Sequence, residues 1–401
     1  MSKVYIVDAK RTAIGSMLGT LKSITPGELG ATVVKNILET TKLDPNKIDE
    51  LICGNILSAG QKQGVGRQVE LLAGIPFEVP AYSLNMICGS GMKAVINAYT
   101  GIKSGFTNIV VAGGSEVMSN TPYLVSSNTR SGVKMGNFQM VDHMINDSLT
   151  DAFSGVHMGI TAENIANKYN ISREEQDQFA YNSQQKAISA IDNGLFKDEI
   201  VPVTIKTKKE EIVFDTDEYP NRKTNLDKLA NLRPAFVKDG SVTAGNASGI
   251  NDGAAFLLVA SEEACKENNL KPIVEIVSVG QGGVDPQFMG LGPVPAIRQA
   301  LKNANLTLKD IDIIELNEAF SAQSLGVIKE LTEEHNVTKD WILERTNVTG
   351  GAIALGHPVG SSGARIIVTL IHNMLRNNKK VGLASLCIGG GMGTAIIVKL
   401  V

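Results

Sequence analysis

The chain has 401 residues, which is more than one hydrophobic core normally serves, because single cores stop growing at roughly 250 to 300 residues. Its 38 Lys and Arg nearly balance 41 Asp and Glu, so it lacks the strong positive charge typical of nucleic-acid-binding proteins. Four widely spaced cysteines argue against a zinc site and a disulfide framework, and no apolar run approaches the roughly 20 residues that cross a bilayer, so we expect a cytoplasmic protein without a membrane segment or bound metal.

Two distant segments repeat one pattern of helix, polar turn and strand. Residues 33–52 (VVKNILETTKLDPNKIDELI) match residues 296–315 (AIRQALKNANLTLKDIDIIE). A second match aligns 90–95 and 108–114 with 362–367 and 380–386, and apolar strands after glycine-containing turns end the halves at 249–261 and 389–400. Alternating short strands and amphipathic helices predict an α/β fold of two similar halves in layers, with mainly parallel sheets covered on both faces.

Residues 119–248 interrupt this repeat and are more polar than their surroundings. Ser172, with Glu175 three residues on, has the spacing of a capping box and predicts the start of a long amphipathic helix. An insertion of this length is too large for a plain loop, and such segments commonly carry function. We therefore divide the chain into an N-terminal half (1–118 plus 249–270), an inserted loop domain (119–248) and a C-terminal half (271–401).

Cys88 lies between the apolar segment SLNMI and a predicted helix that opens with small residues, GSGMKAV. A cysteine at the N-terminus of a helix feels the positive end of the helix dipole, which favours the thiolate. The flanking glycines suit a tight strand-to-helix turn of the kind that presents a nucleophile. The alternative is an inert core cysteine, the usual role of a free cysteine.

Three segments of the second half carry further candidate residues. His357 stands between glycines and a helix expected to start at Pro358, which would fix the imidazole on a rigid corner. Asn317 and Glu318 follow a predicted strand, at the end where α/β sheets often bind ligands. Cys387 precedes the turn IGGGMG, whose backbone N–H groups could stabilise an oxyanion, although a buried structural cysteine is equally compatible with the spacing. The glycine clusters match neither a dinucleotide-binding fingerprint nor a P-loop.

Four blocks in this order resemble the thiolase family: NMICGSGMKA around Cys88, NEAF at 317–320, GGAIALGHPVGSSGAR around His357, and LCIGGGMG around Cys387. The resemblance covers essentially the whole chain. It implies a thiolase-like fold of two similar α/β halves in an αβαβα layered arrangement with an inserted loop domain. It also implies a homotetramer built as a dimer of dimers, with residues 125–145 reaching across subunits.

The same resemblance implies the chemistry. Cys88 would take an acyl group as a thioester after His357 activates its sulfur, and Cys387 would exchange the α-proton of a second acyl-CoA. A thiol suits that exchange because its unperturbed pKa is about 8.5. One oxyanion would be held by His357 and a water on Asn317, and the other by the backbone N–H groups of Cys88 and Gly389.

For coenzyme A, the resemblance points mainly to the insertion, with no cofactor besides the CoA thioester substrates. The pantetheine wall would be formed by Leu149, His157, Met158, Ala244 and Ser248, with Ala319 and Phe320 closing the tunnel. Arg222 would lie near the adenine and phosphates; Lys228 departs from the small polar residue common in the family, so its contact with the nucleotide is an open point.

The segment HMG at 157–159 and the stretch DPQFMGLGPVPA resemble short-chain, biosynthetic thiolases that convert two acetyl-CoA into acetoacetyl-CoA and CoA. Met158 and Met289 are the candidates for narrowing the acyl pocket, because a packed thioether leaves no room for further methylenes.

A degradative 3-ketoacyl-CoA thiolase with a broader chain-length range is the alternative. A ketoacyl synthase is disfavoured by the second cysteine, and a catalytically inactive acyl-CoA-binding relative by the presence of both cysteines and His357. The two reactive cysteines also suggest an inactivating disulfide under oxidising conditions.

Overall fold

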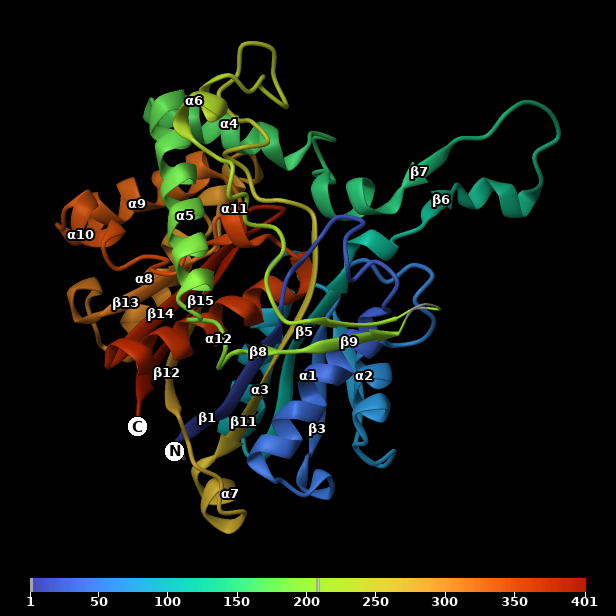
Figure 1. Cartoon of the computed structure of the whole chain (residues 1–401), viewed down its shortest axis with the longest axis vertical. Helices are drawn as coiled ribbons and strands as arrows, with labels where there is room; N and C mark the ends of the chain where they lie inside the picture. The colour runs from blue at the N-terminus through green and yellow to red at the C-terminus, as the bar shows by residue number, and fades with distance from the viewer. Residues whose placement is uncertain (1–2, 207, 209) are drawn as a thin grey trace.

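A computed structural model of the chain describes residues 3–206, 208 and 210–401. Two halves with a similar order of elements lie side by side (Figure 1). Most of the first is blue to teal, with its last strand and helix in yellow, and most of the second is orange to red. The first half contains β1 (Val4–Thr12), α1 (Pro26–Thr41), β3 (Glu50–Gly54), α2 (Val65–Ala73), β4 (Ala81–Leu84), α3 (Ser90–Lys103), β5 (Ile109–Val117), β11 (Asn251–Ser261) and α7 (Glu262–Glu267). The second contains β12 (Val274–Gly283), α8 (Pro293–Ala304), β13 (Ile313–Leu316), α9 (Ser321–His335), α10 (Lys339–Leu343), α11 (Ala352–Leu355), α12 (Val359–Asn377), β14 (Val381–Ile388) and β15 (Met392–Leu400).

The repeat seen in the sequence is present in the strand order. The first half runs β1-β11-β5-β3-β4 and the second β12-β15-β14-β13, and β1 pairs with β12 to join the halves into one sheet. Equivalent loops are closed by equivalent aspartates. The Oδ2 atom of Asp49 accepts from the backbone N–H groups of Asn108 and Ile109, and that of Asp312 accepts from those of Lys380 and Val381.

The expectation of mainly parallel sheets is wrong. Within each half only the strands joined through a helix are parallel: β3 with β4 and with β5 in the first, and β13 with β14 in the second. The last strand of each half inserts antiparallel between the first strand and the helix-linked pair. A short glycine turn between β14 and β15 forces this direction, because a tight turn can join only antiparallel strands.

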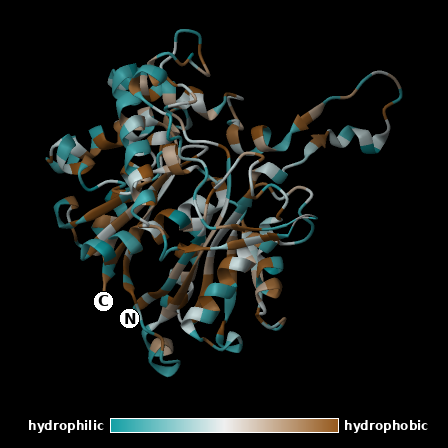
Figure 2. Ribbon diagram, in the orientation of Figure 1, coloured by the Kyte–Doolittle hydropathy of each residue, from teal (hydrophilic) through white to brown (hydrophobic). Residues whose placement is uncertain are grey.

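Helices and strands form five layers, as expected. The helices α3 and α12 pack against each other and share an apolar core with strands of both halves, forming the middle layer. The outer layers are α1 and α2 on the first half and α8 and α9 on the second. Hydrophobic residues accordingly concentrate on the central strands, while polar residues lie on outer helices such as α5 (Arg173–Asp192) (Figure 2).

Glycines allow the N-terminal ends of α3 and α12 to come very close. A Cβ atom on Gly91 of α3 would stand 2.8 Å from the backbone nitrogen of Ala364, and one on Gly363 of α12 would stand 2.5 Å from the backbone nitrogen of Met92. Any larger residue would push these two helices apart. The approach matters because Cys88 and His357 precede these same two helix starts.

The insertion contains two helices that pack on the second half and a projecting arm. The arm is a hairpin of β6 (Tyr123–Val125) and β7 (Met140–Asp142), which extends away from the body (Figure 1). The remaining regular elements are α4 (Met158–Tyr169), α5, β8 (Ile200–Val201), β9 (Val203–Lys206), β10 (Glu211–Phe214) and α6 (Leu226–Ala230), with the short β2 (Gly15–Ser16) beside β11. The capping box of Ser172 and Glu175 is confirmed at the start of α5.

A buried ion-pair cluster joins the insertion to the first half. The guanidinium of Arg11, fully buried in β1, pairs with Glu199 at 2.6 Å and with Asp217 at 2.8 Å. Both carboxylates belong to the insertion, whose boundaries at 119 and 248 stay a prediction. Among the described residues, none of the helices combines the length and apolarity needed to cross a bilayer.

Candidate active site

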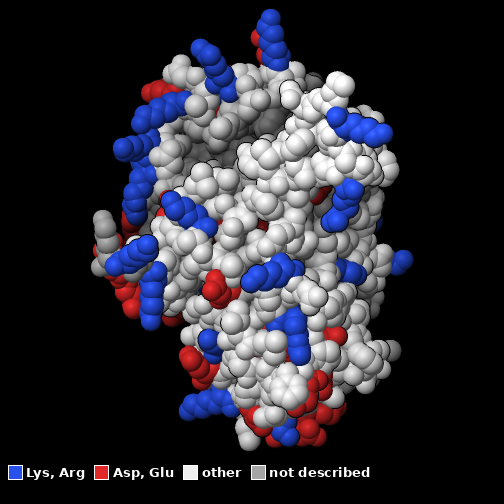
Figure 3. All heavy atoms as spheres, turned by 90° about the vertical axis from the view of Figure 1, so that its right-hand side faces the viewer, with Lys and Arg blue, Asp and Glu red and all other residues white. Residues whose placement is uncertain are grey.

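A cavity of about 570 Å³ brings together side chains from both halves and the insertion. Its lining includes Cys88, His357, Cys387 and Gly389, which lie far apart in the sequence. Figure 3 shows the side of the molecule that faces right in Figure 1. The upper part of this side is hollowed, and Lys and Arg side chains stand around the hollow.

Cys88 lies in a strained turn between β4 and α3. The preceding residue, Ile87, has φ +46°, a left-handed conformation that is unfavourable for a β-branched residue. Ser90 holds the turn closed, because its Oγ accepts from the N–H of Met86 (2.9 Å) and donates to the carbonyl of Ile87 (2.6 Å). The expected strand-to-helix turn is present, and it places the thiol in the cavity.

The thiol of Cys88 is not activated by the helix alone. Burial raises its pKa to about 11, even though the backbone N–H groups of Gly389 and Cys88 point at the sulfur and lower it. Burial therefore opposes the thiolate that the helix N-terminus is expected to favour, because the charged form loses its hydration. At neutral pH the nucleophile needs a base.

His357 can supply that base. Burial lowers the pKa of its imidazole to about 4, with Arg365 as a second cause, so the ring is neutral at pH 7. Nδ1 lies 2.6 Å from Ser362 Oγ, and the Ser362 hydroxyl donates to the carbonyl of Pro358 (2.8 Å). This arrangement places the ring proton on Nδ1 and leaves a lone pair on Nε2, which has no hydrogen-bond partner within the part of the chain that is described.

The backbone around His357 is fixed as expected, with one shift. Gly356 has φ +105°, and a Cβ atom there would lie 2.4 Å from the side chain of Asn251. The Asn251 Oδ1 atom accepts from the N–H of His357 at 3.0 Å. Pro358 is the N-cap of α12 and not its first helical residue, which is Val359.

Cys387 is the penultimate residue of β14, lines the same cavity and is buried. Burial, and then the neighbouring Cys88, raise the pKa of its thiol well above the usual value. All four cysteines are free thiols, so the disulfide between Cys88 and Cys387 stays a prediction. The glycine turn that follows directs the Gly389 N–H toward Cys88, and Gly390 and Gly391 adopt φ +83° and +85°.

The cavity extends from the two cysteines along an apolar wall. All seven residues predicted for the pantetheine wall and tunnel line it: Leu149, His157, Met158, Ala244, Ser248, Ala319 and Phe320. His157 is also the N-cap of α4, with Nδ1 accepting from the N–H of Gly159 at 3.0 Å. Met289, expected to narrow the acyl end, lies in the same lining.

Arg222 and Lys228 do not line this cavity. They line an adjoining one of about 820 Å³, and Ser16, Tyr219 and Ala244 border both. The Arg222 guanidinium forms an exposed ion pair with Asp192 at 2.6 Å, and Lys228 Nζ donates to the carbonyl of Lys223 at 2.8 Å. The two cavities are therefore neighbours, and only the first contains the cysteines.

Comparison with known proteins assigns the family. The model of the thiolase N-terminal domain matches residues 4–263, and that of the thiolase C-terminal domain matches residues 270–400. The chain belongs to the thiolase family. As a thiolase it is an acyltransferase.

Similar thiolases cover nearly the whole chain. It is 51% identical to the acetyl-CoA acetyltransferase of Chromobacterium violaceum and 52% identical to that of Pseudomonas aeruginosa, covering 99% of both proteins in each case. Crystal structures of the Bacillus anthracis acetyl-CoA acetyltransferase (TM-score 0.95) and of human mitochondrial 3-ketoacyl-CoA thiolase (TM-score 0.94) are each 43% identical to it. Each alignment spans 100% of this chain and 99% of the solved one.

Asn317 is placed differently from the other predicted residues of this thiolase. It follows β13 and is fully buried outside the cavity lining, and neither side-chain polar atom has a partner among residues 3–206, 208 and 210–401. Its role in holding a water stays a prediction. Over the same residues, no group of three or more His, Cys, Asp or Glu side chains is arranged to hold a metal ion.

Two residues of the site were missed in the sequence. Phe236 stacks on His157 with ring centroids 4.7 Å apart and meets Phe320 edge-on at 6.2 Å. Nothing in its segment NLRPAF distinguishes this phenylalanine from a core residue. Ser362, the partner of His357, could have been found, because the fifth residue after a histidine at a helix start lies above it on the first turn.

The buried imidazole also predicts a pH effect on stability. The folded pKa of His357, about 4, lies below the unfolded value near 6.5, so protons favour the unfolded chain between those limits. This contribution to stability is present above pH 6.5 and lost as the pH falls toward 4, by about 3 kcal/mol in total. We expect the free energy of unfolding to fall less steeply from pH 6.5 to 4.5 in His357→Gln than in the unaltered protein, as measured by urea denaturation. Parallel curves would contradict a buried neutral imidazole.

Proposed function

We propose that this thiolase is an acetyl-CoA C-acetyltransferase, which reversibly condenses two acetyl-CoA into acetoacetyl-CoA and CoA by a ping-pong mechanism. The observation that carries this proposal is the meeting of Cys88, a neutral His357 and Cys387 in one cavity. The relatives named acetyl-CoA acetyltransferases support the substrate. No cofactor is required beyond the CoA thioesters, because each step moves only protons and an acyl group.

In the first half-reaction, Cys88 Sγ attacks the carbonyl carbon of acetyl-CoA. Its proton passes to His357 Nε2, and the oxyanion accepts hydrogen bonds from the backbone N–H groups of Cys88 and Gly389. The carbon–sulfur bond to CoA then breaks, and the CoA thiolate takes the proton of Cys387. Acetyl-Cys88, a Cys387 thiolate and a protonated His357 remain.

In the second half-reaction, the Cys387 thiolate removes the α-proton of a new acetyl-CoA. Burial makes this thiolate a strong base, as its raised pKa indicates. The enolate oxygen is held by protonated His357 and by a water on Asn317, and the enolate carbon attacks acetyl-Cys88. Cys88 leaves as a thiolate and recovers the proton from His357, so acetoacetyl-CoA is formed and every group returns to its starting state.

The acyl end of the cavity favours short chains. Met158 and Met289 are both buried in the apolar cluster that contains Cys387. A Cβ atom on Gly389 would lie 3.5 Å from Met158 Sδ, so the thioether stands close to the turn that follows the reactive thiols. Such close packing leaves little space for additional methylenes.

A broader, degradative activity is the second candidate, since human mitochondrial 3-ketoacyl-CoA thiolase has the same fold. The test is steady-state thiolysis of acetoacetyl-CoA and of a long-chain 3-ketoacyl-CoA by CoA. We expect kcat/KM to be at least about 100-fold higher for the short substrate, the discrimination that a few unaccommodated methylenes can produce. Similar values for both would assign the degradative activity.

We further propose a homotetramer, with the β6–β7 arm as its contact. The arm exposes large apolar side chains that a single chain leaves in water, with Met135 at 94%, Met140 at 66% and Phe138 at 58% exposure. Light scattering should give the mass of four chains. A mass of two chains would mean that the arm has another use.

A further inference from the structure

Two small structural elements, α6 and the loop 243–248, contribute to the lining of the two cavities. The helix carries Lys228, which lines the second cavity, and the loop contributes Ala244 and Ser248 to the first. They touch at Gly245, where a Cβ atom would lie 2.5 Å from the side chains of Leu229 and Leu232. Because both cavities share Ala244 of this loop, the position of α6 bears on how the two cavities meet.

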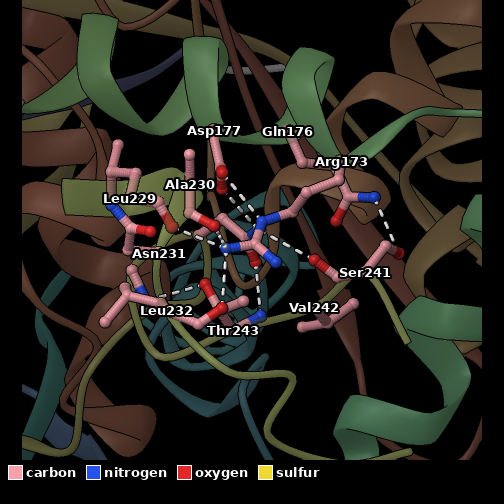
Figure 4. A network of polar contacts seen from close by, with 12 residues as sticks. Arg173, Gln176, Asp177, Leu229, Ala230, Asn231, Leu232, Ser241, Val242 and Thr243 are labelled. Carbon is pink, nitrogen blue, oxygen red and sulfur yellow. Dashed lines mark hydrogen bonds and ion pairs between the residues drawn. The ribbon is translucent and has the colours of Figure 1, made fainter. Parts of the chain in front are cut away.

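Arg173 holds the C-terminal end of α6 (Figure 4). Its Nη2 donates to the carbonyls of Leu229 (2.5 Å) and Leu232 (3.0 Å), and its Nε donates to Asp177 Oδ2 at 2.7 Å. Carbonyls at a helix C-terminus carry partial negative charge, so a guanidinium binds them well. Arg173 is itself the first residue of α5, where the helix dipole disfavours a cation, and these contacts offset that cost.

Asp177, the ion-pair partner of Arg173, also binds the loop 243–248. Asn246 donates from Nδ2 to Asp177 Oδ1 at 2.9 Å, and its Oδ1 accepts from the N–H of Thr243 at 2.8 Å. The loop is joined to the catalytic half by backbone bonds, from Ser321 N to the Asn246 carbonyl and from Ser248 N to the Ala319 carbonyl, both 2.9 Å. Asp177 and Asn246 are buried, so these contacts are shielded from water.

We propose that Arg173, acting with Asp177 and Asn246, is a positioning residue for coenzyme A. It keeps the cavity lined by Lys228, which would take the nucleotide, correctly placed beside the cavity that contains Cys88, which would take the pantetheine. The inference rests on the proposed function, which assigns both cavities to CoA. Arg173 itself lines neither cavity, but it hydrogen-bonds the backbone of Leu229 and Leu232, which line the second one, so it acts by fixing α6 and the loop. Its loss frees the nucleotide end and leaves the pantetheine end supported by its bonds to Ala319 and Ser321.

Calorimetry with CoA and with pantetheine, which lacks the nucleotide, tests this proposal on the full chain. In Arg173→Met we expect the Kd for CoA to rise about tenfold, because hydrogen bonds to a charged group are lost, and the Kd for pantetheine to change less than about twofold. Equal increases for both ligands, or no change for CoA, would overturn the proposal. Arg298→Met is the matched control, because Arg298 forms a similar two-bond pair with Glu334 outside both cavities.

Arg173→Lys distinguishes the effect of the hydrogen-bond geometry of Arg173 from the effect of its charge. It also tests the proposal if Arg173→Met does not fold. Lysine keeps the cation but lacks the planar fork that spans a carboxylate and two carbonyls. We expect its Kd for CoA to rise as well, by about threefold, with pantetheine unaffected. A value equal to that of the unaltered protein would show that charge alone matters and would overturn the positioning role. Binding is independent of turnover, so CoA binding without acetoacetyl-CoA cleavage would reject the proposed function alone.

Discussion

Cys88→Ser is expected to lower kcat for thiolysis of acetoacetyl-CoA by about four orders of magnitude, the usual scale for loss of a covalent nucleophile. Serine is close to cysteine in size, so the turn closed by Ser90 should persist. A hydroxyl is far harder to deprotonate than a thiol, and a neutral imidazole with a pKa of about 4 is too weak a base to compensate. The loss should therefore appear in kcat, with little change in KM.

Mass spectrometry after incubation with acetyl-CoA alone gives a second measurement. One acetyl group should be found on the peptide that contains Cys88, and none in the serine variant. Cys265→Ser is the control, because Cys265 is buried in a separate core of the first half and should leave both results unchanged. Acetylation of a different cysteine, or turnover that survives in Cys88→Ser, would contradict the assignment of the nucleophile.

Much of the fold was predictable because the sequence contains an internal repeat. The matched segments 33–52 and 296–315 each fold as a helix, a short turn and a strand, and even the loop-closing Asp49 and Asp312 correspond. Strand direction was not predictable in the same way. Alternating helices and strands suggested parallel neighbours, but the last strand of each half returns beside the first, a long-range pairing that no local pattern records.

The site shows the same division between local and distant causes. Residues in distinctive motifs, such as Cys88, His357 and Gly389, could be singled out from the sequence, and they line one cavity. The raised pKa of Cys88 could not be predicted from its motif, because burial depends on what the rest of the chain places above the thiol. Phe236 and Arg173 were missed for a related reason: neither belongs to a motif, and the ring partners of Phe236 and the carbonyl partners of Arg173 lie in other segments.

A second substitution, Cys387→Ser, is expected to affect the two half-reactions differently. Cys387→Ser should reduce condensation and thiolysis by about three orders of magnitude or more, because a serine hydroxyl cannot act as a base toward an α-proton near neutral pH. Acetyl transfer from acetyl-CoA to Cys88 involves no α-proton, and Cys88, His357 and the N–H of Gly389 are unaltered. Acetyl-Cys88 should therefore still form in this variant.

Two assays on the same samples distinguish these outcomes. One measures acetoacetyl-CoA formation and cleavage, and the other measures exchange of labelled CoA into acetyl-CoA, which requires only the first half-reaction. Cys387→Ser should lose the first activity and keep most of the second, with some slowing because the departing CoA thiolate loses its proton donor. Cys88→Ser should lose both. Equal loss of exchange and condensation in Cys387→Ser would mean that Cys387 is needed for acyl transfer itself, and the α-proton would then require a different base.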